Sequence, residues 1–266
     1  MTLWWLAYPA LGVFGGFFAG LFGVGGGLTI VPLLFMLFAA QGFPVQHTMH
    51  LALGTSMATI VVTSISSMRA HHRHGAVRWD VVKAFAPGLM LGTFSGSFVV
   101  AWVPTRPLAM VFTAIVYYAA LQLILDFKPK PHRSLPGALG MFAAGAAIGI
   151  VSSLVAAGGG FLSIPFMVFC NVAIHQAVGT SAALGFPIAL AGTVGYVASG
   201  LKATGLPDYS LGYIYLPAFV GVVAMSFLMA PVGAKLAHRL PVKQLKRAFG
   251  GFLALLATKM LHGLLS

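Results

Sequence analysis

The sequence has almost no acidic residues: three Asp and no Glu stand against fifteen Lys and Arg in 266 residues. Charged residues make up only 7 % of the chain, whereas a soluble domain has about 25 %. So few charges cannot cover a surface that faces water, which excludes an ordinary soluble protein. Asp80, Asp126 and Asp208 are expected at or near loop ends. Many cation-coupled carriers need an acidic residue inside the membrane, so this shortage suits an anionic substrate.

Cysteine is almost absent as well. The single residue, Cys170, excludes an intramolecular disulfide and a cysteine cluster for a metal, and we expect neither metal nor cofactor. The basic excess would suggest nucleic acid in a soluble protein. In a membrane protein it is better explained by Lys and Arg in cytoplasmic loops. The expected partners are therefore the lipid bilayer and a small anion, with no nucleic acid.

Long apolar runs dominate the rest of the chain, and the mean hydropathy is +0.96. The runs are about 20 residues long, the length of a membrane-crossing helix, and they lack the alternation of a barrel strand. They predict an all-α integral membrane protein. The expected helices are 4–22, 28–40, 48–67, 84–102, 108–126, 136–156, 161–171, 178–200, 211–231 and 248–265.

Two glycine runs interrupt these apolar segments. The first occupies residues 23–27 except position 24, and the second, Gly158–Gly160, follows 133 positions later. A proline stands five residues after the last glycine of each run, at Pro32 and Pro165. Glycine and proline at these positions predict two helices that are broken inside the membrane.

Further matches in the same order indicate an internal duplication. His50 precedes a Gly-Thr-Ser triplet by four residues, and His175 does the same in the second half. We therefore predict a first repeat over 1–127, a linker over 128–135 and a second repeat over 136–266. Each repeat would consist of a Gly-broken helix pair followed by three transmembrane helices.

The basic segments predict how the repeats are oriented. Placing residues 68–83, 127–134 and 235–247 in the cytoplasm follows the positive-inside rule. The helices after each broken pair then run in opposite senses in the two halves, which predicts two inverted repeats with both termini extracytoplasmic. Inverted repeats are common in secondary transporters, which bind substrate between the halves at the membrane midplane.

The glycine runs could bind an anion without any charged side chain. A helix that starts inside the membrane presents free N–H groups and its positive dipole end, and glycine allows close approach of a ligand. The alternative is that the glycines serve only turns and tight helix packing. The candidate residues are Gly25, Gly26, Gly27, Leu28, Gly158, Gly159, Gly160 and Phe161.

Hydroxyl and imidazole groups of the repeated motif are further candidates. Thr55, Ser56, Thr180 and Ser181 could donate hydrogen bonds to anion oxygens, or they could bond to helix carbonyls and neighbouring helices. The serines that flank the second break are weaker candidates for the same role: Ser152, Ser153 and Ser163. His50 and His175 could carry a proton near neutral pH; the alternative is a pair of interfacial histidines. A second histidine group, at residues 71, 72 and 74, is expected in a solvated basic loop.

The doubled Gly-Gly-Gly-(Leu/Phe)-x-x-x-Pro motif, the Gly-Thr-Ser triplets, the length and the duplication resemble the sulfite exporter TauE/SafE family. The resemblance covers essentially the whole chain. It implies transport of a small sulfur-containing anion, such as sulfite, sulfoacetate or a related sulfonate, around the two glycine motifs. Leu28 stands where the second copy has Phe161, the residue typical of the motif.

We therefore predict an inner-membrane secondary transporter that exports a sulfur oxyanion by alternating access around the glycine breaks. A selective anion channel and a small organic-acid permease are the alternatives. An intramembrane hydrolase using Ser181 and His175 is remote, because a spacing of six puts the two on opposite sides of a helix. The glycine ladders could pack helices within one chain or between two, so a homodimer is an open alternative.

Overall fold

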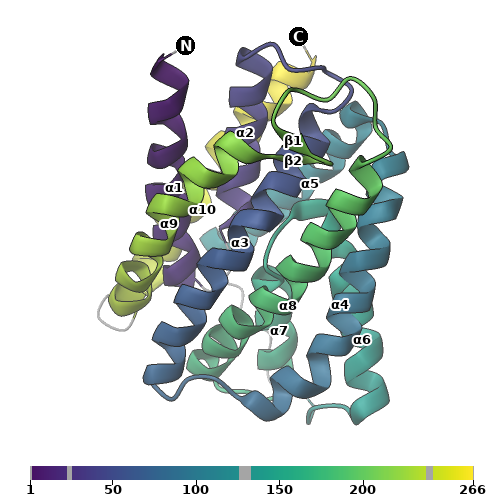
Figure 1. Cartoon of the computed structure of the whole chain (residues 1–266). Helices are drawn as coiled ribbons and strands as arrows, with labels where there is room; N and C mark the ends of the chain where they lie inside the picture. The colour runs from purple at the N-terminus through teal and green to yellow at the C-terminus, as the bar shows by residue number, and fades with distance from the viewer. Residues whose placement is uncertain (1, 23–25, 126–132, 238–241, 266) are drawn as a thin grey trace.

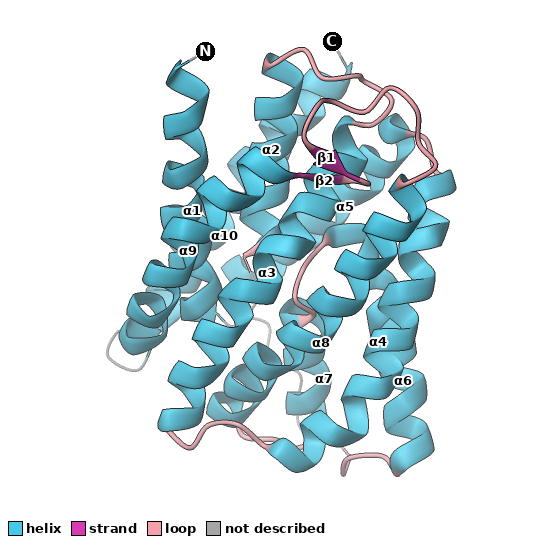
Figure 2. Cartoon of the chain, in the orientation of Figure 1, coloured by secondary structure: helices cyan, strands magenta, loops and turns pink. Residues whose placement is uncertain are grey.

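The structure is a computed structural model that describes residues 2–22, 26–125, 133–237 and 242–265. The described residues form ten helices and one short β-ribbon (Figures 1 and 2). Eight helices are long and apolar enough to cross a membrane, and two shorter ones, α2 and α7, follow the glycine runs. The elements are α1 (Thr2–Phe22), α2 (Gly27–Ala40), α3 (Thr48–Arg73), α4 (Trp79–Trp102), α5 (Thr105–Leu125), α6 (Ala138–Val155), α7 (Gly160–Phe169), α8 (Ile174–Gly200), β1 (Ser210–Leu211), β2 (Ile214–Tyr215), α9 (Leu216–Ala237) and α10 (Val242–Leu265).

The prediction of an all-α membrane fold is confirmed, but several helix bounds were wrong. Helix α3 continues to Arg73 and α4 begins at Trp79, so most of the expected basic loop is helical. Apolar periodicity underestimates these ends because the last turns extend beyond the hydrophobic core, where basic side chains are tolerated. The expected span over 211–231 begins only at Leu216. The preceding residues turn through Gly212, at φ 55°, and pair as β1 and β2.

Helices from the first half of the sequence pack against helices from the second half. Helix α1 packs along α9, α4 along α6, α3 along α8 and α5 along α10. Small residues allow the close approach: a Cβ at Gly20 would lie 1.9 Å from the carbonyl oxygen of Ala230, and one at Gly92 would lie 2.1 Å from that of Ala146. Small-residue contacts of this kind bring helices together in membranes, where no hydrophobic driving force acts between them.

Both ends of the chain lie at the same end of the bundle (Figure 1). Helix α1 starts at that end, whereas α6 starts at the opposite end, where the amide of Arg133 donates to the carbonyl of Phe169 at 3.3 Å. The division into repeats stays a prediction. The predicted linker lies largely outside the described residues.

Candidate functional site

The two glycine breaks meet inside the helix bundle. A Cβ at Gly27, the first residue of α2, would lie 1.8 Å from the carbonyl oxygen of Ala156, in the segment before α7. Only a glycine permits this contact between the breaks. Gly25 lies outside the described residues. The structure thus brings together two segments that are 129 positions apart in the sequence.

Both breaks start the following helix in the same way. Gly26 precedes α2 with φ 76° and ψ −9°, and Gly159 precedes α7 with φ 74° and ψ −10°. These left-handed angles are readily adopted by glycine. They turn the chain sharply enough for a new helix to begin within the bundle.

The first turns of α2 and α7 present backbone donors. The amides of Thr29 and Ile30 donate to the carbonyl of Gly26, and those of Leu162 and Ser163 donate to the carbonyl of Gly159. The amides of the first two residues of each helix have no helical carbonyl to donate to. These are the amides of Gly27 and Leu28 in α2 and of Gly160 and Phe161 in α7. They stand at the positive end of the helix dipole, an arrangement that binds anions.

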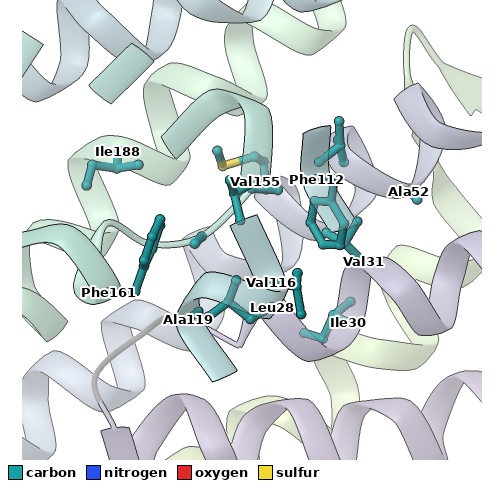
Figure 3. Close-up of a cluster of buried hydrophobic side chains, with 14 of the residues drawn as sticks. Leu28, Ile30, Val31, Ala52, Phe112, Val116, Ala119, Val155, Phe161 and Ile188 are labelled. Atoms are coloured by element: carbon teal, nitrogen blue, oxygen red, sulfur yellow. The ribbon is translucent and has the colours of Figure 1, made fainter. Parts of the chain in front are cut away.

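An apolar cluster surrounds the two helix starts (Figure 3). Leu28 and Phe161, which follow the glycines, are both buried and belong to this cluster. Helix α5 contributes Phe112, Val116 and Ala119 to it. The cluster keeps water away from the helix starts, which strengthens electrostatic interactions there.

Charged side chains lie elsewhere in the described residues. The buried polar side chains of the described residues are hydroxyls and histidines, and none of them is an Asp, Glu, Lys or Arg. Electrostatic binding at the breaks would therefore have to come from backbone dipoles and hydroxyl groups.

The sequence model of the family described as "Sulfite exporter TauE/SafE" matches residues 8–260. The chain belongs to the TauE/SafE family. A probable membrane transporter protein of Haemophilus influenzae is 39 % identical over 255 residues, covering 94 % of this chain and 95 % of the relative. Probable membrane transporter proteins of Bacillus subtilis (YdhB) and Methanocaldococcus jannaschii (MJ0441) are 27 % and 23 % identical, covering about 90 % of each chain. No solved structure matches.

These relatives make this TauE/SafE chain a multi-pass membrane transporter rather than an enzyme. The structure places the residues of the remote hydrolase hypothesis in different environments. Ser181 is fully buried and accepts a hydrogen bond from Ser163 at 3.2 Å, whereas His175 is exposed in the first turn of α8.

The repeated Gly-Thr pairs of this TauE/SafE chain dock segments from the other half. Thr55 Oγ1 accepts from the amide of Tyr215 at 2.9 Å, and Thr180 Oγ1 accepts from the amide of Arg78 at 3.0 Å. The glycine before each threonine lies against the same segment: a Cβ at Gly54 would be 2.2 Å from the carbonyl oxygen of Tyr213. The corresponding Gly179 distance, to the carbonyl oxygen of Ala76, is 2.6 Å. These contacts agree with the alternative in which the threonines bond to neighbouring elements.

Residues 210–215, which form the β1–β2 ribbon that packs on Gly54 and Thr55, include no Asp, Glu, Lys or Arg. Burial raises the pKa of Tyr213 and Tyr215 above the usual value of a phenol, and for Tyr215 the neighbouring Asp208 and Tyr209 raise the pKa further. Both phenols therefore stay neutral at physiological pH.

The two repeated histidines do not share one environment. His50 is 3 % exposed, lies with Nε2 3.2 Å from the carbonyl oxygen of Val100, and stacks on Tyr213. His175 is exposed at the opposite end of the bundle, so the structure does not bring the two together. The expectation that His71 is solvated in a loop was wrong. It is 1 % exposed in the last turn of α3, with Nε2 3.3 Å from the carbonyl oxygen of Gly20.

The two prolines lie inside the short helices, at the sixth residue of each. Pro32 and Pro165 have no amide to donate, so the carbonyls of Leu28 and Phe161 lose their usual helical partners. The prolines thus mark equivalent positions in α2 and α7.

One polar side chain near the second break, Tyr196, was missing from the predicted site, and another, Ser152, was only a weaker candidate. Tyr196 is fully buried in α8 and donates to the carbonyl of Ser153 at 2.7 Å, which ties α8 to the end of α6. The hydroxyl of Ser152 is fully buried beside Gly159. Its sequence signal is its position six residues before the second glycine run.

Proposed function

We propose that this transporter carries a small oxyanion, sulfite or an organosulfonate, by alternating access around the two glycine breaks. The observation that carries the proposal is the meeting of two helix starts inside the bundle, each with left-handed glycine at its first turn. Membrane transporters use such half-helix N-termini to bind anionic groups. The description of the family as sulfite exporters supports a sulfur oxyanion as the substrate.

The surroundings of the helix starts favour an anion over a cation. The described residues bury no carboxylate that could bind a cation. The donors available at the breaks are amides and hydroxyls, and the apolar cluster around them lowers the local dielectric. A charge that is shared among amide dipoles is stabilised most strongly where water is excluded.

We place the substrate path between two inverted repeats in the inner membrane, with both termini outside. In support, eight described Lys and Arg side chains lie at the end of the bundle opposite the termini, against three at the same end as the termini. Cytoplasmic segments are enriched in Lys and Arg. The basic side chains of the first group are Arg69, Arg73, Arg78, Lys83, Arg133, Lys235, Lys246 and Arg247, and those of the second are Arg106, Lys202 and Lys259.

Export follows from the electrical driving force on an anion. A cell interior that is negative by 100 mV favours the exit of one negative charge by about 2.3 kcal/mol. A carrier of this kind needs no coupling ion to move its substrate outward.

The test is transport by the purified protein in liposomes that are loaded with radiolabelled sulfite. We expect saturable efflux that accelerates when the potential is negative inside, with competition by sulfoacetate but weak competition by chloride and acetate. Gly159→Leu should abolish the flux, because its side chain would occupy the start of α7. Gly42→Leu is the matched control, since Gly42 has φ 75° and nothing within 4 Å of its Cβ position.

Two results would contradict the proposal. A flux that rises linearly with substrate and far exceeds carrier rates would identify an anion channel. Normal sulfite transport by a folded Gly159→Leu variant would place the substrate site away from the breaks.

A further inference from the structure

The two breaks share their backbone geometry but differ in the side chain behind the glycine. At the first break, Ala19 Cβ lies 3.3 Å from the position that a Cβ on Gly26 would occupy. At the second break, Ser152 Oγ lies 3.7 Å from the corresponding position on Gly159. The serine follows the alanine by 133 residues, the same interval that separates the glycines. A hydroxyl in one half thus stands where the other half has a methyl group.

The Ser152 hydroxyl is buried without a hydrogen-bond partner. Its side chain is fully buried, and Oγ has no partner among the described residues. A buried hydroxyl that bonds to nothing costs free energy, and most such groups in proteins are satisfied. The adjacent hydroxyls are used: Ser153 donates to the carbonyl of Ile150 at 2.7 Å, and Ser163 donates to Ser181. Of these three hydroxyls, only that of Ser152 has no partner. The candidate Ser56, in α3, is also buried without a hydrogen-bond partner for its hydroxyl.

We infer that Ser152 donates its hydroxyl proton to an oxygen of the bound anion, which the first amides of α7 hold at the second break. The first break would then form the apolar wall of the site rather than a second anion-binding half. This assignment rests on the proposed function and narrows it to one side chain. A hydroxyl donor favours a substrate that presents an oxygen acceptor over a halide of similar charge.

At the first break, the position that Ser152 holds at the second has no hydroxyl. The hydroxyl of Thr29 already donates to the carbonyl of Gly26 at 2.7 Å. The carbonyl oxygen of Gly15 lies 2.7 Å, and Ile30 Cδ1 3.3 Å, from the Cβ position of Gly26. The methyl group of Ala19 therefore occupies the place that the Ser152 hydroxyl has at the second break.

The test compares sulfite affinity in wild type and Ser152→Ala, by the Michaelis constant of liposome efflux and by thermal-shift titration of the purified protein. A hydrogen bond to a charged ligand is worth enough for about a 10- to 100-fold loss of affinity. The unfolding temperature without ligand should stay close to that of wild type, because the hydroxyl has no protein partner to lose. Ser153→Ala is the matched control and should leave sulfite affinity unchanged.

Two more variants guard against a folding defect and against a merely structural role. Ser152→Cys keeps the volume but donates weakly, so it should have an affinity between those of wild type and Ser152→Ala. Ala19→Ser combined with Ser152→Ala should not restore affinity, because the carbonyl oxygen of Gly15, which would repel an anion, faces Gly26 at the first break.

Each outcome separates this inference from the proposed function. If wild type transports sulfite and Ser152→Ala has an unchanged affinity, the inference fails while the proposed function stands. Restoration by Ala19→Ser would also overturn it, since the two breaks would then be interchangeable. If wild type neither binds nor transports any oxyanion tested, the proposed function fails and takes the inference with it.

Discussion

The two glycine breaks have nearly identical backbones and different neighbours. The angles of Gly26 and Gly159 differ by 2° in φ and 1° in ψ. Behind Gly26 stand the backbone of α1 at Gly15 and the methyl group of Ala19, whereas behind Gly159 stand Ile188 and the hydroxyl of Ser152. A helix that starts inside the bundle therefore requires one backbone conformation at the glycine before it, whereas the side chains around that glycine can differ between the two halves.

The neighbours also differ in how easily they could move. Helix α1 is locked against α9, where Cβ atoms at Gly16 and Gly20 would lie within 2.5 Å of backbone atoms of the facing helix. The Gly15 carbonyl that faces Gly26 therefore cannot move away to make room for a new side chain. Ile188 Cδ1, by contrast, is the end of a flexible side chain and can rotate to another rotamer.

The largest effect is therefore expected from Gly26→Ala, compared with Gly159→Ala. Both variants place a side chain at positive φ, which costs about 1–2 kcal/mol. The new Cβ of Gly26→Ala would also lie 2.7 Å from the Gly15 carbonyl oxygen, while that of Gly159→Ala would meet Ile188 Cδ1 at 2.5 Å. We expect Gly26→Ala to lower stability by about 1–3 kcal/mol more, since overpacking against a rigid backbone has that cost. Thermal unfolding of the purified proteins in detergent measures the difference.

Gly42→Ala isolates the backbone strain, because Gly42 has a similar positive φ and open space around it. Gly159→Ala should fall between this control and Gly26→Ala. Equal unfolding temperatures for Gly26→Ala and Gly159→Ala would show that the surroundings of the two breaks are mechanically equivalent.

A smaller loss of stability, similar in size for the two variants, is expected from Thr55→Val and Thr180→Val. Each variant keeps the side-chain shape but removes the acceptor of one amide, that of Tyr215 or of Arg78. A partly buried amide without an acceptor costs about 1–3 kcal/mol, so both variants should unfold at lower temperature and to a similar extent.

Thr59→Val is the control for the threonine pair. Thr59 is fully buried, but its hydroxyl donates only to carbonyls of its own helix, at Thr55 and Ser56. Its removal leaves no amide without an acceptor, and stability should change little. A loss of stability in Thr59→Val as large as that in Thr55→Val would mean that these threonines stabilise the protein by packing and not by accepting a hydrogen bond.

The sequence was sufficient to predict the membrane class, the helix breaks and the family. Charge depletion and apolar run length predict spanning helices, and a glycine run inside such a segment has few structural uses. The helix bounds were less predictable. Residues such as Arg69 and Lys83 continue helices past the apolar core, so hydropathy places the ends several residues too early or too late.

The contacts between the halves could not be predicted from one sequence. The Gly-Thr repeats are visible as a pattern, but their partners, at residues 76–78 and 213–215, share no residue type that would identify them. Similarly, Ser152 can be told apart from Ser153 and Ser163 only when its burial, its missing partner and its distance from Gly159 are known. Such properties depend on packing between distant segments, which local pattern does not encode.

The smallest perturbation tests whether the two halves enter the membrane from opposite sides. A Cys170→Ser background removes the only native cysteine. Single cysteines are then introduced at Ser134, which is exposed just before α6, and at Thr204, which is exposed at the end that also holds the termini. In intact cells a membrane-impermeant maleimide should label Thr204→Cys and leave Ser134→Cys unmodified until the cells are permeabilised. Both sites are exposed, so function and stability should remain close to those of the background.

The reverse labelling pattern would keep the two halves opposed but turn the whole protein over, so that the termini and the less basic end face the cytoplasm. Labelling of both cysteines in intact cells would contradict the assignment of the two sites to opposite membrane faces, and with it the inverted arrangement of the halves.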